Sequence, residues 1–172
     1  MTDSDVRIAF NEHSGAIYRF SWRMTGSPSA AEDITQDVFL LLLRRPDQFD
    51  PRRGQLRPFL IGVARNLARK WLLRESRWNE LDDEQLVAEP AEMEGRDLTE
   101  SVGAAVSSLP ATQREVLLLT HYGGFSLDEI ARIVNIDVGA VKARLHRARQ
   151  NLKRTLAPLW LANREVGNGI TK

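Results

Sequence analysis

The sequence predicts an all-α protein of two small helical domains joined by an acidic, flexible linker. Apolar residues recur at helical spacing along five stretches, and no stretch shows the strict alternation or β-branched enrichment typical of a strand. A length of 172 residues with 42% hydrophobic content suffices to build hydrophobic cores. Residues 79–96 separate the helical stretches and combine many acidic side chains with few large apolar ones, which is the composition of a linker.

The first predicted helix covers about residues 4–24 and ends where Gly26 and Pro28 break the pattern. The second is expected to begin at Ser29, whose hydroxyl can cap the amide of Glu32 while the Glu32 carboxylate reaches back, a Ser-x-x-Glu capping box. The apolar stripe expected on the first helix comprises Phe10, His13, Ile17, Ser21 and Met24.

The second predicted helix continues to Arg45 and has two distinct faces. One face is apolar and points toward a core, while the other is polar with the i, i+3, i+4 spacing of neighbours on a helix surface. The apolar face comprises Ile34, Val38 and Leu41, and the polar face comprises Asp33, Gln36 and Asp37. A polar face of this kind is either simply solvated or a docking surface for a partner.

A basic loop, residues 46–58, leads into a third predicted helix over residues 59–78. Residues 44–77 carry a net charge of about +7, whereas residues 80–100 carry about −8, so the near-neutral total hides strong segregation. The loop and one helix face are expected to form a continuous basic surface. The helix is predicted to bury Leu60, Val63, Ala64, Leu67 and Trp71 and to expose Arg65, Asn66, Arg69, Lys70 and Arg74; Trp78 is also expected in a core.

Two further segments, residues 98–110 and 111–125, precede a predicted helix-turn-helix. Its first helix is short, with a capping box from Ser126 and Glu129 at the start and Asn135 suited to a left-handed turn at the end. Asp137 is expected to cap the next helix, where residues 138–154 hold six cations and no carboxylate: Lys142, Arg144, Arg147, Arg149, Lys153 and Arg154.

The helical period divides this last helix into a packed stripe and an exposed basic side. The first turns of such a helix usually enter the major groove, while later cations reach phosphates. A solvated helix end whose cations favour the helix dipole is the alternative interpretation. The packed stripe is expected to be Val138, Val141, Leu145, Ala148 and Leu152, and the base-reading candidates are Lys142, Ala143, His146 and Arg147.

The composition argues against several other classes of protein. With no cysteine, the chain can form neither a disulfide nor a thiolate metal site, and its three histidines lack a second ligand at helical spacing. Neither a phosphate-binding Gly-Lys loop nor a paired-carboxylate metal motif is present, so we expect no enzyme and no cofactor. The apolar run at residues 38–43 is too short to span a bilayer and the N-terminus does not resemble a signal peptide, so a soluble, cytoplasmic protein without membrane insertion is expected.

Two motif blocks in this order resemble those of the bacterial extracytoplasmic-function group of sigma factors. The first consists of "AEDITQDVFLLLL" followed by "FDPRRGQLRPFLIGVARNLARKWL", and the second, after the acidic stretch, is "LPATQREVLLLTHYGGFSLDEIARIVNIDVGAVKARLHRARQNLKRTL". The resemblance covers residues 9–156. It implies a promoter-specific transcription initiation factor that performs no chemistry itself and whose partners are core RNA polymerase and promoter DNA; an anti-sigma factor is a further candidate partner.

The resemblance also implies roles for particular residues. In this family the polar face of the second helix binds the clamp helices of the largest polymerase subunit, which here maps to Asp33, Gln36 and Asp37. The following loop and helix capture an unstacked base of the −10 element, and the helix-turn-helix reads the −35 element. The matching −10 residues are Arg52, Arg53, Gly54, Gln55, Asn66, Arg69 and Lys70, and the −35 residues are Lys142, Ala143, Arg144, His146, Arg147 and Arg149.

The expected domain organisation follows from these blocks. Residues 1–78 form the polymerase and −10 domain, residues 79–96 the acidic linker, residues 97–157 the −35 domain and residues 158–172 a short tail. Two other functions remain open at this point. The chain could be an autonomous helix-turn-helix regulator with an N-terminal helical sensory domain, or a helical adaptor whose basic faces are merely solvated; an intact "AEDITQDVF" block argues against both.

Overall fold

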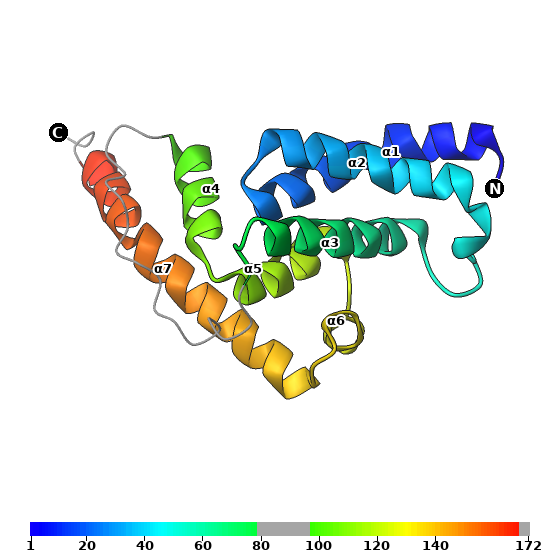
Figure 1. Ribbon diagram of the computed structural model, residues 1–172. Helices are drawn as coiled ribbons and strands as arrows, with labels where there is room; N and C mark the ends of the chain where they lie inside the picture. Colours follow the sequence, from blue (N-terminus) through cyan, green and yellow to red (C-terminus); the bar gives the residue numbers. More distant parts are fainter. Residues whose placement is uncertain (79–96, 169–172) are drawn as a thin grey trace.

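The computed structural model describes residues 1–78 and 97–168, which are helical and contain no strand within these ranges (Figure 1). This confirms the predicted all-α fold, and the two segments ahead of the helix-turn-helix are also helices. The predicted linker, residues 79–96, lies outside the described residues. The elements are α1 (Asp3–Thr25), α2 (Pro28–Arg44), a 3₁₀ turn η1 (Pro46–Gln48), α3 (Leu56–Arg74), α4 (Leu98–Ser108), α5 (Ala111–Leu118), a π-helical turn η3 (Leu119–Gly123), α6 (Leu127–Val134) and α7 (Val138–Asn168).

The N-terminal half is a three-helix unit in which α1 packs against both α2 and α3. Helix α1 ends at Gly26, whose left-handed backbone, with φ of 69°, lets its amide donate to the Trp22 carbonyl. The prediction that Ser29 caps α2 was wrong. Ser27 is the N-cap and accepts from the Ala30 amide, because Pro28 takes the first helical position, where its fixed φ suits a helix and its missing N–H is not needed.

The buried side of α1 also differs from the predicted stripe. Phe10 is 44% exposed and packs edge-on against the Phe39 ring, with a centroid separation of 4.9 Å, instead of lying in the core. Val6 and Ala9 are buried there instead, because α1 packs against α4 and α5 as well as against α2 and α3. The buried residues of α1 are Val6, Ala9, Ile17, Phe20, Ser21, Met24 and Thr25.

Helix α3 begins three residues earlier than predicted, at Leu56. Pro58 does not prevent this, since the amides of a first helical turn have no partner within the helix. The predicted stripe is only part of what α3 buries: Leu60 and Ala64 are buried, whereas Val63, Leu67 and Trp71 are half-buried. A second row of buried residues comprises Ile61, Arg65, Ala68 and Leu72.

The C-terminal half is built on α7, which packs against α4, α5 and α6. The predicted capping of its helix-turn-helix is confirmed: Ser126 and Glu129 form both bonds of a capping box, and Asp137 Oδ1 accepts from the Ala140 amide at 2.8 Å. The predicted stripe on α7 is confirmed as well, with Val141, Leu145 and Ala148 buried and Val138 and Leu152 half-buried. The predicted tail at residues 158–172 begins inside α7, which continues to Asn168.

Asn135 ends α6 in the left-handed conformation, with φ of 57° and ψ of 49°. We expect Asn135→Val to lower the free energy of unfolding by about 1–2 kcal/mol, because a β-branched residue is strained at this backbone angle. Asn135→Gly should leave it within roughly 0.5 kcal/mol of the parent. Both values can be measured by urea denaturation, and a Val variant as stable as the parent would refute the proposed strain.

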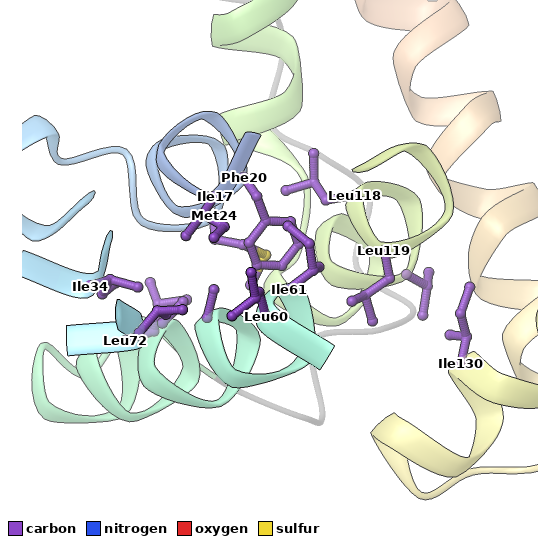
Figure 2. Packing of buried hydrophobic residues seen from close by; sticks show 14 of the residues in the cluster. Ile17, Phe20, Met24, Ile34, Leu60, Ile61, Leu72, Leu118, Leu119 and Ile130 are labelled. Atoms are coloured by element: carbon purple, nitrogen blue, oxygen red, sulfur yellow. The ribbon is translucent and has the colours of Figure 1, made fainter. Parts of the chain in front are cut away.

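The two halves share one buried apolar cluster (Figure 2). Leu118 and Leu119 lie beside Phe20 and Ile61, so the end of α5 and the π-helical turn pack on α1 and α3. This packing accounts for the burial of Ile61 and Arg65 in the second row of α3, whereas Leu72 of that row lies beside Ile34 of α2. The halves are therefore held together by direct contact in addition to the chain that links them.

Candidate nucleic-acid interface

The predicted polar face of α2 is fully presented to solvent. Asp33, Gln36 and Asp37 are all exposed, while Ile34 and Val38 on the opposite side are buried in the core. The face contains two carboxylates and an amide on a single rigid helix, which holds their relative positions fixed. Such a surface is suited to a partner that offers cations and hydrogen-bond donors.

The basic loop before α3 is shaped by Asp50. Its carboxylate accepts from both the backbone amide and the side chain of Arg52, at 3.0 and 3.2 Å, and its carbonyl accepts from the Arg53 amide at 2.9 Å. Gly54 follows with φ of 156°, and Gln55 is the N-cap of α3. All four predicted −10 residues of the loop are exposed, with the Arg52 side chain 91% accessible.

The basic face of α3 has the predicted residues at different depths. Asn66 and Lys70 are exposed, whereas Arg69 is half-buried and its guanidinium lies 5.4 Å from the ring centre of Trp78. Trp78 is buried, as predicted, and belongs to the apolar core cluster. A guanidinium over an indole ring is attracted by the ring, which helps to hold the Arg69 side chain in place.

The prediction that Arg65 belongs to the exposed face was wrong. Arg65 is only 8% exposed, and its Nε donates to Glu115 Oε2 of α5 at 2.7 Å, with Nη1 donating to Asn66 Oδ1 at 3.2 Å. Arg65 is buried because the C-terminal half of the protein, through α5, covers this part of α3. An ion pair compensates the charge that burial would otherwise penalise.

A cavity of about 830 Å³ separates the basic loop before α3 from the C-terminal half. One wall contains Arg53, Gly54, Gln55 and Asn66, which are predicted −10 residues, together with the Phe49 and Phe59 rings. The opposite wall comes from the start of the helix-turn-helix: Gly124, Phe125, Glu129, Arg132 and Ile133. Aromatic rings beside cations and amides are the groups that bind an unstacked base and its phosphates.

On α7 the predicted −35 residues divide by exposure. Lys142, His146 and Arg149 are exposed, and Ala143, Arg144 and Arg147 are half-buried. The charge of Arg144 acts on the carboxyl of Glu115 in α5, so we infer that Arg144 lies on the side of α7 that faces α5. The exposed residues Lys142, His146 and Arg149 therefore provide most of the surface that could enter a DNA groove.

Two charged residues important to the arrangement were not predicted from the sequence. Arg114 donates to the Met24 carbonyl at the C-terminal end of α1 and to the Leu109 carbonyl at 3.2 Å, and burial together with the charge of Arg77 lowers the pKa of Arg114 to about 10. Glu115 is the partner of Arg65. The sequence gives only a weak signal for Arg114 and Glu115. Two adjacent charged residues inside a mostly apolar helix, "ATQREVLLL", are equally typical of a solvated helix face.

The motif blocks have counterparts among known proteins. Residues 9–78 match sigma-70 region 2, and residues 99–152 match sigma-70 region 4. SigW of Bacillus subtilis, an ECF RNA polymerase sigma factor, is 32% identical over 158 residues, covering 83% of this chain and 84% of SigW. The chain belongs to the ECF group of sigma-70 factors.

Other relatives agree with this assignment. The sigma factor is 30% identical to the ECF RNA polymerase sigma factor SigE of Mycolicibacterium smegmatis over 154 residues, and it spans 59% of the length of SigE. Its structure resembles the sigma factor RpoE of Bartonella quintana, solved with the anti-sigma factor NepR, with a TM-score of 0.69, 26% identity and 89% and 97% of the two chains covered.

Family membership settles the general function. The sigma factor is a promoter-specific transcription initiation factor that binds core RNA polymerase and promoter DNA, and its matched regions are not catalytic domains. Since α1–α3 form region 2, the alternative of an N-terminal sensory domain is excluded. Among the helices of residues 1–78 and 97–168, none is both long and apolar enough to cross a bilayer.

Proposed function

We propose that the sigma factor binds core polymerase through the exposed face of α2, Asp33, Gln36 and Asp37. This face is acidic, exposed and held on one helix. An acidic helix face is matched by cations on a partner, and such complementarity sets the orientation in which the two proteins dock. The assignment also follows the family motif that these three residues match.

For the −10 element, we propose the loop and the exposed face of α3. The residues are Arg52, Arg53, Gly54, Gln55, Asn66, Arg69 and Lys70, and four of them line the cavity between the two halves. The arginines and Lys70 provide phosphate contacts, while Asn66 and the neighbouring aromatic rings can hold a base that has left the stack.

For the −35 element, we propose the first turns of α7. Lys142, His146 and Arg149 are exposed there, with Ala143, Arg144 and Arg147 beside them. The confirmed capping of α6 and α7 fixes the angle between the two helices, which is what a helix-turn-helix needs in order to insert its second helix into the major groove.

The single observation that carries the proposal is the presence in one chain of an exposed acidic face on region 2 and exposed basic side chains on both regions. We propose residues 1–78 and 97–157 as the functional domains, and the cytoplasm, where polymerase works, as the location. RpoE was solved with an anti-sigma factor, so a protein of that kind is a candidate regulator of this chain too.

The direct test is run-off transcription with purified sigma factor, core polymerase and a library of promoter fragments. The proposal predicts transcripts that depend on the sigma factor and start at a common distance from shared −35 and −10 sequences. Core polymerase alone serves as the control. Transcripts that are absent, or equally frequent without the sigma factor, would reject the proposed function.

Within α7, Lys142→Ala and Arg147→Ala should each cost about 1–3 kcal/mol of binding and relax the sequence preference at one −35 position, if they pair with base edges. Lys153→Ala, which lies later on the same exposed row, should weaken binding evenly and reduce its salt dependence, as a lost phosphate contact does. A binding-selection assay with the polymerase complex distinguishes the two patterns. Identical behaviour of all three variants would contradict the division of the helix.

A further inference from the structure

Regions 2 and 4 of the sigma factor are joined by a buried ion pair. Arg65 of α3 and Glu115 of α5 have side chains that are 10% and 1% exposed, and their charged atoms are 2.7 Å apart. The pair joins two parts of the chain that are distant in sequence. It can therefore exist only while region 4 is packed on region 2, and separating the regions exposes both charges to water.

Cations from both proposed DNA surfaces surround Glu115. Arg69 of the −10 face and Arg144 of the −35 helix act on its carboxyl together with Arg65. Burial nevertheless raises the pKa of Glu115 above its ordinary value, because the loss of hydration outweighs the effect of the neighbouring cations. A carboxylate held among guanidinium groups occupies the chemical position that a DNA phosphate takes in a complex.

Region 4 also lies across the proposed −10 site. Arg57, in the first turn of α3, donates through Nε to the Tyr122 carbonyl at 3.0 Å. The cavity that contains the −10 loop is bounded on its other side by residues of region 4, including Phe125 and Arg132. DNA that entered this site would have to displace region 4 or share the space with it.

We propose that the Arg65–Glu115 pair is an internal latch that holds region 4 over the −10 site and opens when DNA phosphates bind the cations of α3. This proposal rests on the proposed −10 role of α3 and adds a regulatory contact to it. Because a buried charge left without its partner is strongly unfavourable, a substitution at either position should open the latch.

The test uses two labels to follow the separation of the regions. The chain has no cysteine, so Ser29→Cys on α2 and Ser107→Cys on α4, both exposed positions, can carry a donor and an acceptor dye. Energy transfer is measured for the full chain, for Glu115→Gln and for the control Glu75→Gln, an exposed carboxylate at the end of α3. Far-UV circular dichroism checks that each variant remains helical.

Binding to a randomised pool of short single-stranded DNA is measured on the same proteins by fluorescence anisotropy. Glu115→Gln should lower energy transfer and raise DNA affinity about 3- to 10-fold, because a larger fraction of molecules has the −10 site open. Glu75→Gln should change neither quantity. Adding the DNA pool to the parent should itself lower energy transfer.

Several results would overturn the latch. They are unchanged energy transfer and affinity in Glu115→Gln, or DNA that binds the parent without separating the labels. A failure of the proposed function would look different, since the parent would then give no sigma-dependent run-off transcripts whatever the labels report. If the parent supports transcription but Glu115→Gln shows no loss of energy transfer, the latch is rejected and the proposed function still holds.

Discussion

Sequence-specific binding of promoter DNA should rise by about 100-fold or more when core polymerase is added to the sigma factor, because two weak sites held at the right separation gain effective concentration. Alone, the chain has two reasons to bind poorly. Region 4 packs against the proposed −10 site, and the nine carboxylates of residues 80–100 can compete with phosphate for nearby cations. Polymerase binding would hold both DNA surfaces at the spacing of the promoter.

Fluorescence anisotropy at fixed salt measures this effect, with a promoter duplex selected by run-off transcription and a scrambled duplex of the same composition. Each duplex is titrated with and without core polymerase, and core polymerase alone is the control. A sigma factor that discriminates tightly between the two duplexes by itself would contradict the mechanism. It would show that neither internal packing nor the separation of the two surfaces limits recognition.

Charge reversal on α2 should disrupt the complex with polymerase. We expect Asp37→Lys combined with Gln36→Ala to weaken binding on the order of 100-fold, because removing one partner of a charge pair that is buried and hydrogen-bonded in the complex typically costs about 2–5 kcal/mol. The free energy of unfolding should change by no more than about 0.5 kcal/mol, since both side chains are exposed and pack against nothing in the core.

A matched control tests whether the effect is local. Asn11→Ala combined with Glu12→Lys makes the same chemical change at two exposed, adjacent positions of α1. This variant should bind core polymerase with the affinity of the parent in a surface-immobilised binding assay. If the α2 variant also retained full affinity while melting normally, the α2 face would not be part of the polymerase interface.

Local signals in the sequence predicted much of this fold correctly. The capping box at Ser126, the left-handed Asn135 and the packed stripe of α7 all depend on short-range chemistry, and the structure confirms each of them. The start of α2 was misplaced because Ser27 and Ser29 both suit an N-cap, and the decision between them depends on Pro28. Short-range rules of equal strength cannot separate neighbouring alternatives.

The contact between the two halves was beyond prediction for a different reason. A pattern along one helix shows which side is apolar, but not how many partners cover it. Arg65 follows the spacing of a basic face, yet it is buried because α5 packs there and supplies Glu115. The proposed DNA and polymerase residues remain predictions, for which the structure gives exposures and neighbours.

The shared cluster of Figure 2 also has a consequence for how the protein is made. Region 2 leaves the ribosome first, and the apolar side chains that pack with Phe20 and Ile61 come from α5, which is synthesised later. At about 5–20 residues per second, the delay is on the order of several seconds. During this interval the side chains of region 2 that will pack against α5 remain uncovered. The growing polypeptide should then be most prone to aggregate, and most accessible to a chaperone, shortly before Leu118 emerges.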